Sequence, residues 1–297
     1  PPPPPPPPPP FFFLKHQPAS SILSGLVGSE MCIRDRYNTI IMPSGSPSMN
    51  ASNTKALMDW VAQGGTLIAN NRSTKFLTSN EEIGSVRMIQ DTFENSNDYN
   101  FDLLRETSAL SEEIDKANIQ QYSLDLEIEY PWESDEERMS QEELEFRDEW
   151  QSIFMPSGAM VAGRVDNKHW LSFGASDVLP ILYGNYPVLM TGKNAEAVIR
   201  IGSYEDNNEV EDYRTINWST IPPGKDLNIR MSGLVWPEAA QRIANSAYVT
   251  REKIGKGQVI LFSGEPNFRG STRGTNRIWL NAVIYGSGLG TNSLVDP

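Results

Sequence analysis

Residues 37–69 read YNTIIMPSGSPSMNASNTKALMDWVAQGGTLIA, and this stretch decides the fold. Its apolar run at residues 37–42 ends in a Pro-Ser-Gly turn, a pattern that predicts a buried strand. Residues 66–69 form a second apolar run and predict the next strand. A strand, a helix and a strand within so short a stretch predict a βαβ unit with a right-handed crossover between two parallel strands.

The helix between these strands should begin at Ser52 or Asn53, because both residues are good N-caps, and should end at the Gly64-Gly65 pair. Its apolar positions recur at the spacing of one buried helix face. These positions are Ala56, Leu57, Trp60 and Val61.

The C-terminal part is the most regular part of the chain. Residues 247–253 and 258–262 predict two strands joined by a tight Gly-Lys-Gly turn. Helices are expected before and after this pair. The first covers residues 234–244, with Trp236, Ala240 and Ile243 on its apolar face; the second covers residues 277–285, with Ile278, Leu280, Ala282 and Val283 toward the core. Shorter strands are expected at residues 158–165, 179–183, 186–190 and 197–201.

An acidic segment at about residues 80–150 interrupts this alternation. Residues 81–149 hold 22 Asp and Glu against 5 Lys and Arg. The segment is either a folded cap over the sheet or a mostly disordered acidic loop. Alternating apolar and acidic residues at 124–130 predict at least one strand, and residues 139–150 have a helical pattern. The carboxylates of that strand share one face and could bind calcium, but without EF-hand spacing a solvated polar face is the preferred interpretation.

Residues 1–36 do not read as part of this domain. Ten prolines and three phenylalanines begin the chain, and residues 26–35 (LVGSEMCIRD) resemble the translation of a transposon-type sequencing adapter. We interpret residues 1–36 as a non-native, disordered segment, which leaves residues 37–297 as the domain. The alternative is a polyproline II ligand followed by a signal peptide, but it does not explain the adapter-like string.

The residue types exclude several classes of function. The formal net charge is −13, which disfavours nucleic acid as a partner. The single cysteine, Cys32, lies in the excluded segment, so residues 37–297 cannot build a thiol protease, a Cys-dependent glutaminase or a thiolate zinc site. His169 is the one histidine in that range, which leaves no pair of His ligands for a catalytic zinc. No run of 18 apolar residues occurs, so we expect no membrane span.

Residues 233–284, together with residues 37–45 and 57–69, resemble a known domain family. It is the class I glutamine-amidotransferase-like domain at the C-terminus of bacterial zinc carboxypeptidases of the carboxypeptidase A type. The most specific elements are G-x-G-x-V-x-L-F at residues 255–262 and P-N-F-R-G-x-x-R-G-x-N-R at residues 266–277. The resemblance implies an α/β fold with a flavodoxin-like, doubly wound, mostly parallel sheet that carries the acidic insertion.

The same resemblance implies a truncated parent protein, a zinc metallocarboxypeptidase that is secreted or periplasmic. Its signal peptide, its His-x-x-Glu motif and its distant His zinc ligand would lie upstream of Tyr37. No counterpart of these ligands occurs from Tyr37 onward, so zinc is expected in the parent's peptidase domain and no cofactor or metal in this fragment. The peptidase domain is then the expected partner.

Active amidotransferases carry a Cys on a nucleophile elbow and a His-Pro-Glu after a late strand. Here the late strand at residues 258–262 continues instead into Ser-Gly-Glu-Pro. The resemblance therefore implies a pseudoenzyme domain with no catalytic residues of its own.

In an open α/β sheet, binding residues gather at the carboxyl ends of the strands. The candidate ligand or interface residues at these ends are Ser44, Asn71, Arg72, Glu265, Asn267, Arg269, Arg273 and Arg277. The three C-terminal arginines with Asn267 could bind a carboxylate or phosphate. The preferred alternative is that Arg269 forms an ion pair with Glu238 or Glu265 and pins its loop.

Other singled-out residues have simpler interpretations. Ser44 lacks the G-x-S-x-G context and an identifiable base, so it is not expected to be a nucleophile. His169 is expected to be a packed turn histidine, and Trp132 is the tryptophan expected to be free for an interaction.

Three function classes follow. The favoured one is a non-catalytic accessory domain of a zinc carboxypeptidase-like protein, with the arginine loop at the interface, namely residues 263–274 with Arg269 and Arg273. The alternative is an independent small-molecule or glycan binding module that uses the crevice. An enzyme of unrecognised chemistry is the third, and it would need a perturbed carboxylate pair in a cleft.

Overall fold

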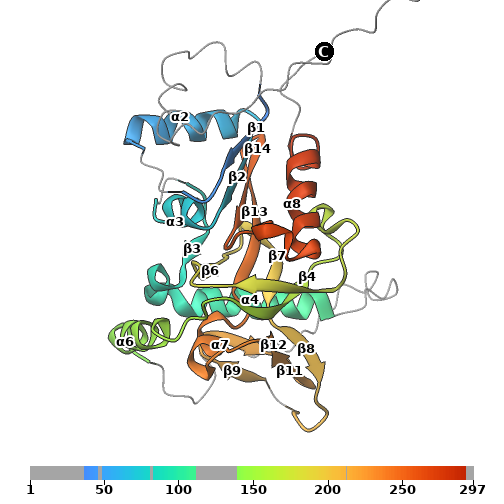
Figure 1. Ribbon diagram of the computed structural model, residues 1–297. Coiled ribbons are helices and arrows are strands. Elements are labelled where there is room, and N and C mark those ends of the chain that lie inside the picture. The colour runs from blue at the N-terminus through green and yellow to red at the C-terminus, as the bar shows by residue number, and fades with distance from the viewer. Residues whose placement is uncertain (1–36, 46–48, 81–82, 112–138, 212, 292–297) are drawn as a thin grey trace, which may run out of the picture.

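The computed structural model describes residues 37–45, 49–80, 83–111, 139–211 and 213–291. The interpretation of residues 1–36, the strand and calcium hypotheses at residues 124–130 and the role of Trp132 lie outside these residues. Figure 1 shows a central sheet with helices on both sides and a group of short strands below it. In the described part of the chain, no helix combines the length and apolar character that a membrane crossing requires.

Ten strands form the central sheet. The order along its main path is β1-β2-β14-β13-β7-β4-β12, while β5 pairs with β4, and β6 pairs with both β13 and β3. The strands are β1 (Thr39–Met42), β2 (Thr66–Asn70), β3 (Arg87–Met88), β4 (Ala159–Val165), β5 (Val178–Tyr183), β6 (Leu189–Met190), β7 (Ala195–Ile201), β12 (Arg230–Ser232), β13 (Ala247–Ile254) and β14 (Gly257–Phe262).

The predicted βαβ unit is confirmed. Strands β1 and β2 are parallel, with Ile41 opposite Ile68, and helix α2 (Ala51–Ala62) connects them. Strand β14 pairs in parallel with the other edge of β2, where Ile260 lies opposite Ile68. Ile68 therefore sits in the middle strand of a three-stranded parallel unit.

Helices cover both faces of this parallel unit, as the doubly wound α/β prediction requires. Helices α2 and α3 (Arg72–Thr78) lie on one side of the sheet and α8 (Arg273–Tyr285) on the other (Figure 1). Neighbouring residues of β2 point to opposite faces. Leu67 belongs to the core with Trp60 of α2, and Ile68 belongs to the core with Ile278 of α8.

Parallel pairing ends at β14. Strand β13 is antiparallel to β14, and β7, β4, β12, β5, β6 and β3 also join the sheet through antiparallel pairs. The expected parallel pairing is thus found among β1, β2 and β14, whereas the other strands of the sheet pair antiparallel. For β13 and β14 the physical reason is the tight turn between them, because a connection this short can join only antiparallel strands.

Helix α2 begins earlier than predicted. Its N-cap is Asn50, whose Oδ1 accepts a hydrogen bond of 2.8 Å from the Asn53 backbone amide, so neither Ser52 nor Asn53 is the cap. Leu57, Trp60 and Val61 are buried as expected, whereas Ala56 is exposed.

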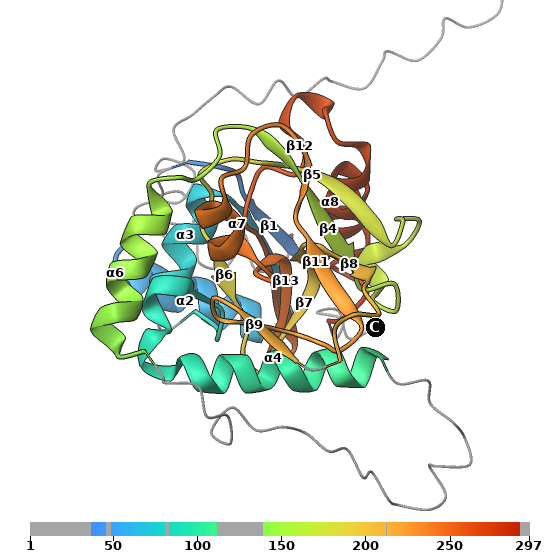
Figure 2. The same ribbon diagram turned by 90° about the horizontal axis from the view of Figure 1, so that it is seen from below.

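Both described ends of the acidic insertion are folded. After the 3₁₀ turns η1 (Ile89–Asp91) and η2 (Phe93–Asn95), helix α4 (Ser96–Ser111) runs along one edge of the molecule in the view from below (Figure 2). Helix α6 (Gln141–Ser152) confirms the helical pattern at residues 139–150. Glu106 of α4 forms an ion pair with the buried Arg200 of β7. Asp148 of α6 forms a two-pronged ion pair with Arg242, at 2.7 and 3.0 Å.

Four short strands between β7 and β12 were not predicted. Strand β8 (Ser203–Asp206) pairs with β11 (Lys225–Asn228), and β9 (Arg214–Ile216) pairs with β10 (Ser219–Ile221), both antiparallel. These strands lie below the central sheet with helix α7 (Pro237–Ile243) (Figures 1 and 2).

Three predicted elements are shorter or placed differently. Helix α7 starts at Pro237 and not at residue 234, because the residue before a proline favours extended backbone; Trp236 is its N-cap and is 49% exposed. Leu280 of α8 is also exposed, while Ile278 is buried. The strand expected at residues 186–190 is limited to its last two residues.

Replacing Gly257 with alanine should destabilise the fold. A Cβ atom there would lie 2.0 Å from the carbonyl oxygen of Val61 and 2.3 Å from that of Gly65. Since both obstacles are backbone atoms, we expect Gly257→Ala to lower the free energy of unfolding in urea by about 2–4 kcal/mol. Gly45→Ala is the control, because its Cβ would make an ordinary contact of 3.7 Å. Equal losses in the two variants would contradict this account.

Candidate functional site

The turn from β2 into α3 has an unusual backbone. Asn71 occupies this turn with φ 46° and ψ −112°, a combination that non-glycine residues rarely adopt. Its backbone amide donates to the carbonyl oxygen of Phe262 at 3.0 Å, and its own carbonyl oxygen accepts from the Lys75 amide at 2.9 Å. The Thr74 hydroxyl donates to the same Phe262 oxygen at 2.8 Å. A strained residue between a strand and a helix is the geometry of a nucleophile elbow.

The structure brings two predicted site residues together at this turn. The side-chain amide of Asn71 donates to Oε1 of Glu265 at 3.2 Å, across 194 positions of sequence. The loop that carries Ser44 is attached to the same edge, because the Ser73 hydroxyl donates to the carbonyl oxygen of Pro43 at 2.6 Å. Asn71 and Glu265 thus lie at the centre of the carboxyl edge, the edge of the sheet where the carboxyl ends of β2 and β14 meet.

Sequence analysis missed a group of tyrosines behind this centre. Burial and the nearby negative charge of Glu265 raise the pKa of Tyr186. Tyr183 packs edge-on against Tyr186 with ring centroids 5.5 Å apart, and burial raises the pKa of Tyr183 to about 12. A Cβ at Gly264 would lie 2.5 Å from the Tyr186 ring, so the glycine allows the ring to approach. Gly264 beside Glu265 was the one sequence signal of this contact.

The arginine loop differs from its preferred interpretation. Among the described residues Arg269 forms no ion pair with Glu238 or Glu265, since Glu265 instead accepts from Asn71. The Arg269 guanidinium lies 5.2 Å from the ring centroid of its neighbour Phe268, in the 3₁₀ turn η4 (Phe268–Gly270). The loop is held by the Thr275 hydroxyl, which donates to the carbonyl oxygen of Pro266 at 2.7 Å. Hydrogen bonds within the loop therefore replace the expected ion pair.

The remaining predicted residues do not join the Asn71–Glu265 centre through any contact of the described chain. Arg72, Asn267 and Arg273 are exposed. Arg277 is exposed and its guanidinium lies against Gly174.

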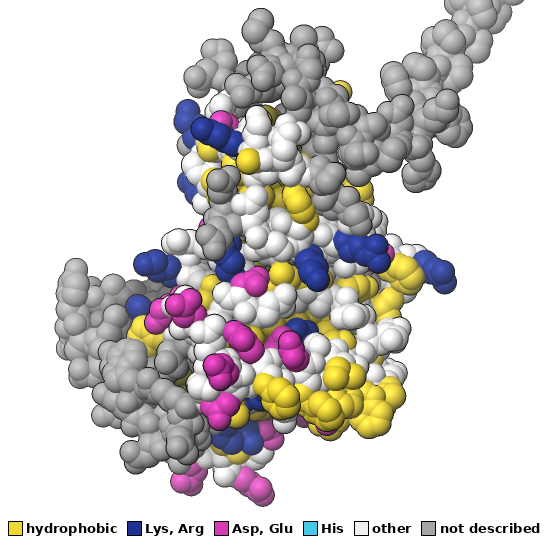
Figure 3. Space-filling view, turned by 90° about the vertical axis from the view of Figure 1, so that its left-hand side faces the viewer, with side chains coloured by type: hydrophobic (Ala, Val, Ile, Leu, Met, Phe, Trp, Pro, Cys, Tyr) yellow, Lys and Arg dark blue, Asp and Glu magenta, His cyan; other side chains and the backbone are white. Residues whose placement is uncertain are grey.

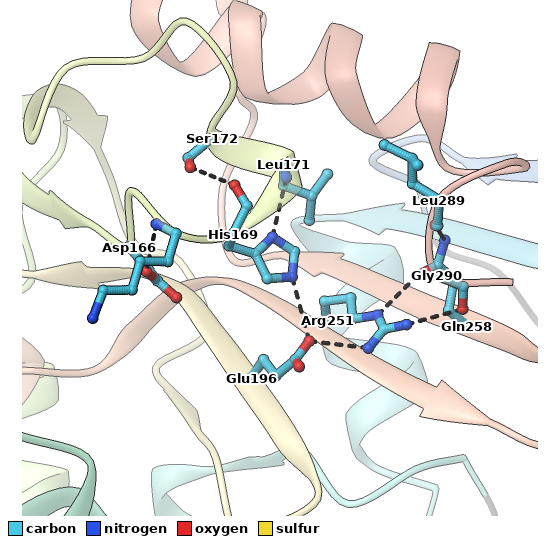
Figure 4. Close-up of polar contacts among 10 residues, drawn as sticks. Asp166, His169, Leu171, Ser172, Glu196, Arg251, Gln258, Leu289 and Gly290 are labelled. Carbon is cyan, nitrogen blue, oxygen red and sulfur yellow. Dashed lines mark hydrogen bonds and ion pairs between the residues drawn. The ribbon is translucent and has the colours of Figure 1, made fainter. Parts of the chain in front are cut away.

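His169 belongs to a separate polar cluster, shown in Figure 4. Its Nδ1 accepts a hydrogen bond of 3.1 Å from the Leu171 amide, so the neutral ring must carry its proton on Nε2. Nε2 lies 3.3 Å from Oε2 of Glu196, which also accepts from Arg251 at 3.0 Å. Both ring nitrogens are occupied, which leaves His169 in the packed turn position that was predicted for it.

The same polar cluster, through Arg251, also connects the sheet to the end of the described chain. Arg251 donates to Oε1 of Gln258 at 2.9 Å and to the carbonyl oxygen of Gly290 at 2.9 Å. The hydrogen bond from His169, and then the charge of Arg251, lower the pKa of Glu196. This arrangement stabilises the ionised carboxylate and offers no free base.

A polar cavity of about 480 Å³ lies beside this cluster. It is lined by Asp102, Arg105, Glu106, Asp166, Thr191, Gly192, Lys193, Ala195, Glu196 and Ala197. Arg200 neutralises Glu106, and Arg251 neutralises Glu196. In the described residues, no group of three or more His, Cys, Asp or Glu side chains could hold a metal ion.

Two substitutions at the strained turn should change the free energy of unfolding by different amounts. Asn71→Gly should change the free energy of unfolding by less than about 1 kcal/mol, because glycine adopts this backbone freely while losing the contact with Glu265. Asn71→Val should lose about 2–3 kcal/mol, because a β-branched residue resists positive φ. Urea unfolding of both variants measures the difference, and equal losses would show that the turn holds no strain.

The lowered pKa of Glu196 predicts a pH dependence. A carboxyl group whose pKa is lower in the folded state contributes stability above its unfolded pKa and loses it as the pH falls through the folded one. Between about pH 5 and pH 3, the wild type should therefore lose more free energy of unfolding than Glu196→Gln. Glu209→Gln, at an exposed carboxylate, is the control and should follow the wild type. Parallel curves for wild type and Glu196→Gln would refute the assignment.

Comparisons with known proteins add little to this geometry. No family model and no curated protein matches the chain. The β-galactosidase from Bacillus circulans sp. alkalophilus is 12% identical with a TM-score of 0.37, over 88% of this chain and 24% of that chain. A cytoplasmic protein from Salmonella typhimurium is 9% identical with a TM-score of 0.34, over 89% of this chain and 74% of that chain. This chain is thus similar to about a quarter of the β-galactosidase, and its own geometry carries the functional argument.

Proposed function

We propose that this chain is a non-catalytic accessory α/β domain of a zinc carboxypeptidase-like parent, and that it docks on the parent's peptidase domain. The observation that carries the proposal is the residue at the β2–α3 turn. Asn71 has the strained backbone of a nucleophile elbow, but its side chain is an amide that donates to Glu265. An amide at this place cannot form the covalent intermediate that a Cys or Ser would form.

The surroundings of Asn71 support the same proposal. Glu265 follows the strand after which active amidotransferases place His-Pro-Glu, and here it accepts a hydrogen bond from the amide. His169 is bound to Leu171 and Glu196 in the other cluster. A retained elbow that holds neither a nucleophile nor a neighbouring imidazole favours a role in binding or positioning. The zinc and the catalytic step then belong to the peptidase domain, and the parent is secreted or periplasmic.

A second candidate is an independent binding module for a small anion or a glycan. The observation that favours it is the state of Arg269 and Arg273, which have no ion-pair partner among the described residues and are both exposed. Two exposed guanidinium groups without an ion-pair partner in the described chain suit a carboxylate or phosphate.

The coding sequence upstream of Tyr37 tests the parent. We expect a carboxypeptidase-type domain with a His-x-x-Glu motif and a distant His, and an unrelated upstream domain would overturn the proposal. In that full-length parent, Asn71→Ala should leave kcat for peptide hydrolysis within about twofold, because the residue does not touch the reacting atoms. Removal of zinc with a chelator should abolish the same activity. A loss of about a hundredfold or more in kcat for Asn71→Ala would place the elbow in the catalytic machinery.

A further inference from the structure

Helix α6 presents its aromatic side chains to solvent, while its Leu144 packs against the core. Phe146 in the middle of this helix, Trp150 in its last turn and Ile153 just after it are 73%, 53% and 71% exposed, respectively. Asp148 and Gln151 of the same helix are buried. An ordinary surface helix of a globular protein has the reverse arrangement.

The buried polar contacts fix this orientation. Asp148 accepts two hydrogen bonds from the guanidinium of Arg242, and both side chains are almost inaccessible to solvent. The side-chain amide of Gln151 donates to Gln241 at 3.3 Å, and its oxygen accepts from Asn217 at 3.3 Å. If the helix rotated to bury Phe146 and Trp150, it would leave Arg242 as an unpaired buried charge, which costs several kcal/mol. The aromatic side is therefore held outward.

The exposed side chains continue onto the start of α7. Trp150 packs edge-on against Phe154 with ring centroids 5.2 Å apart, and Phe154 packs edge-on against Trp236 at 6.3 Å. We define the α6–α7 apolar patch as Phe146, Trp150, Ile153, Phe154, Leu234 and Trp236. In the lower part of Figure 3, apolar side chains gather beside a row of acidic ones. Contiguous exposed aromatic side chains of this kind mark protein interaction surfaces.

The charges around the patch define the partner. Four glutamates of α6 are exposed, namely Glu142, Glu143, Glu145 and Glu149. The only base of this helix is Arg147, which is half-buried. A second copy of the chain docked by two-fold symmetry would bring these glutamates against one another, which like-charge repulsion disfavours. The patch therefore suits a different protein with positive charge at the matching places.

We propose that the α6–α7 apolar patch binds a protein surface that is apolar at its centre and rich in Lys and Arg at its rim. The identity of this partner as the peptidase domain rests on the proposed function. The chemistry of the patch rests only on the exposed aromatic residues and the glutamates beside them.

Fluorescence anisotropy with labelled peptides tests the proposal on the full chain. The probe is an amphipathic helical peptide of leucine and lysine, compared with the matched leucine–glutamate and serine–lysine peptides. The leucine–lysine peptide should bind and the other two should not. The double variant Phe146→Ser/Trp150→Ser should weaken binding by about tenfold or more. Leu280→Ser, at an exposed apolar residue of α8 outside the patch, is the control and should bind as the wild type does.

A charge reversal tests the rim separately. Glu142→Lys/Glu145→Lys should lose the leucine–lysine peptide and gain the leucine–glutamate peptide, whereas Glu209→Lys should change neither. Circular dichroism of each variant should match the wild type, since every replaced side chain is exposed.

Two results would overturn the proposal. In the first, the double variant Phe146→Ser/Trp150→Ser binds the leucine–lysine peptide as tightly as the wild type does. In the second, the wild type sediments as a dimer and the same variant as a monomer, which would make a second copy of the chain the occupant of the patch. An upstream sequence without a peptidase domain would refute the proposed function but leave the peptide result intact.

Discussion

The close contact between the turn at residues 255–257 and the end of α2 joins the two parts of the sheet. The Lys256 amide donates to the carbonyl oxygen of Ala62 at 2.9 Å, and the Gln258 amide donates to that of Gly65 at 3.1 Å. Strand β14 lies between β2, with which it pairs in parallel, and β13, with which it pairs antiparallel. The carboxyl edge depends on it, because the carbonyl oxygen of Phe262 at the end of β14 accepts from both Asn71 and Thr74. Strand pairing, helix docking and the strained turn are therefore one cooperative unit.

Much of this unit could be predicted from local patterns. The apolar runs that became β1, β2, β13 and β14 are bounded by glycines and prolines, and such punctuation is readable without tertiary information. The sequence also placed Ser44, Asn71 and Glu265 at one edge, because strand direction alone determines which ends meet. The cap of α2 was misplaced by two or three residues, since Asn50, Ser52 and Asn53 are chemically equivalent candidates and tertiary packing chooses among them.

The rest depends on contacts between residues that are far apart in the sequence. Nothing in the local sequence shows that Asn71 has positive φ, because the strain is imposed by Phe262 and Glu265. The orientation of α6 is similar, since its own sequence contains both an aromatic and a charged side, and contacts with the distant Arg242, Gln241 and Asn217 determine which one is buried. The strands between β7 and β12 are three or four residues long, which is too short for a clear alternation pattern.

Helices α4 and α6 are each attached to the body by their own ion pair, through Arg200 and Arg242. Helix α6 also starts with a self-contained capping box between Ser140 and Glu143. The two helices thus each have their own contacts with the body, on either side of residues 112–138 in the sequence. Because each helix has its own anchor on the body, a change that loosens one of them need not move the other from its place.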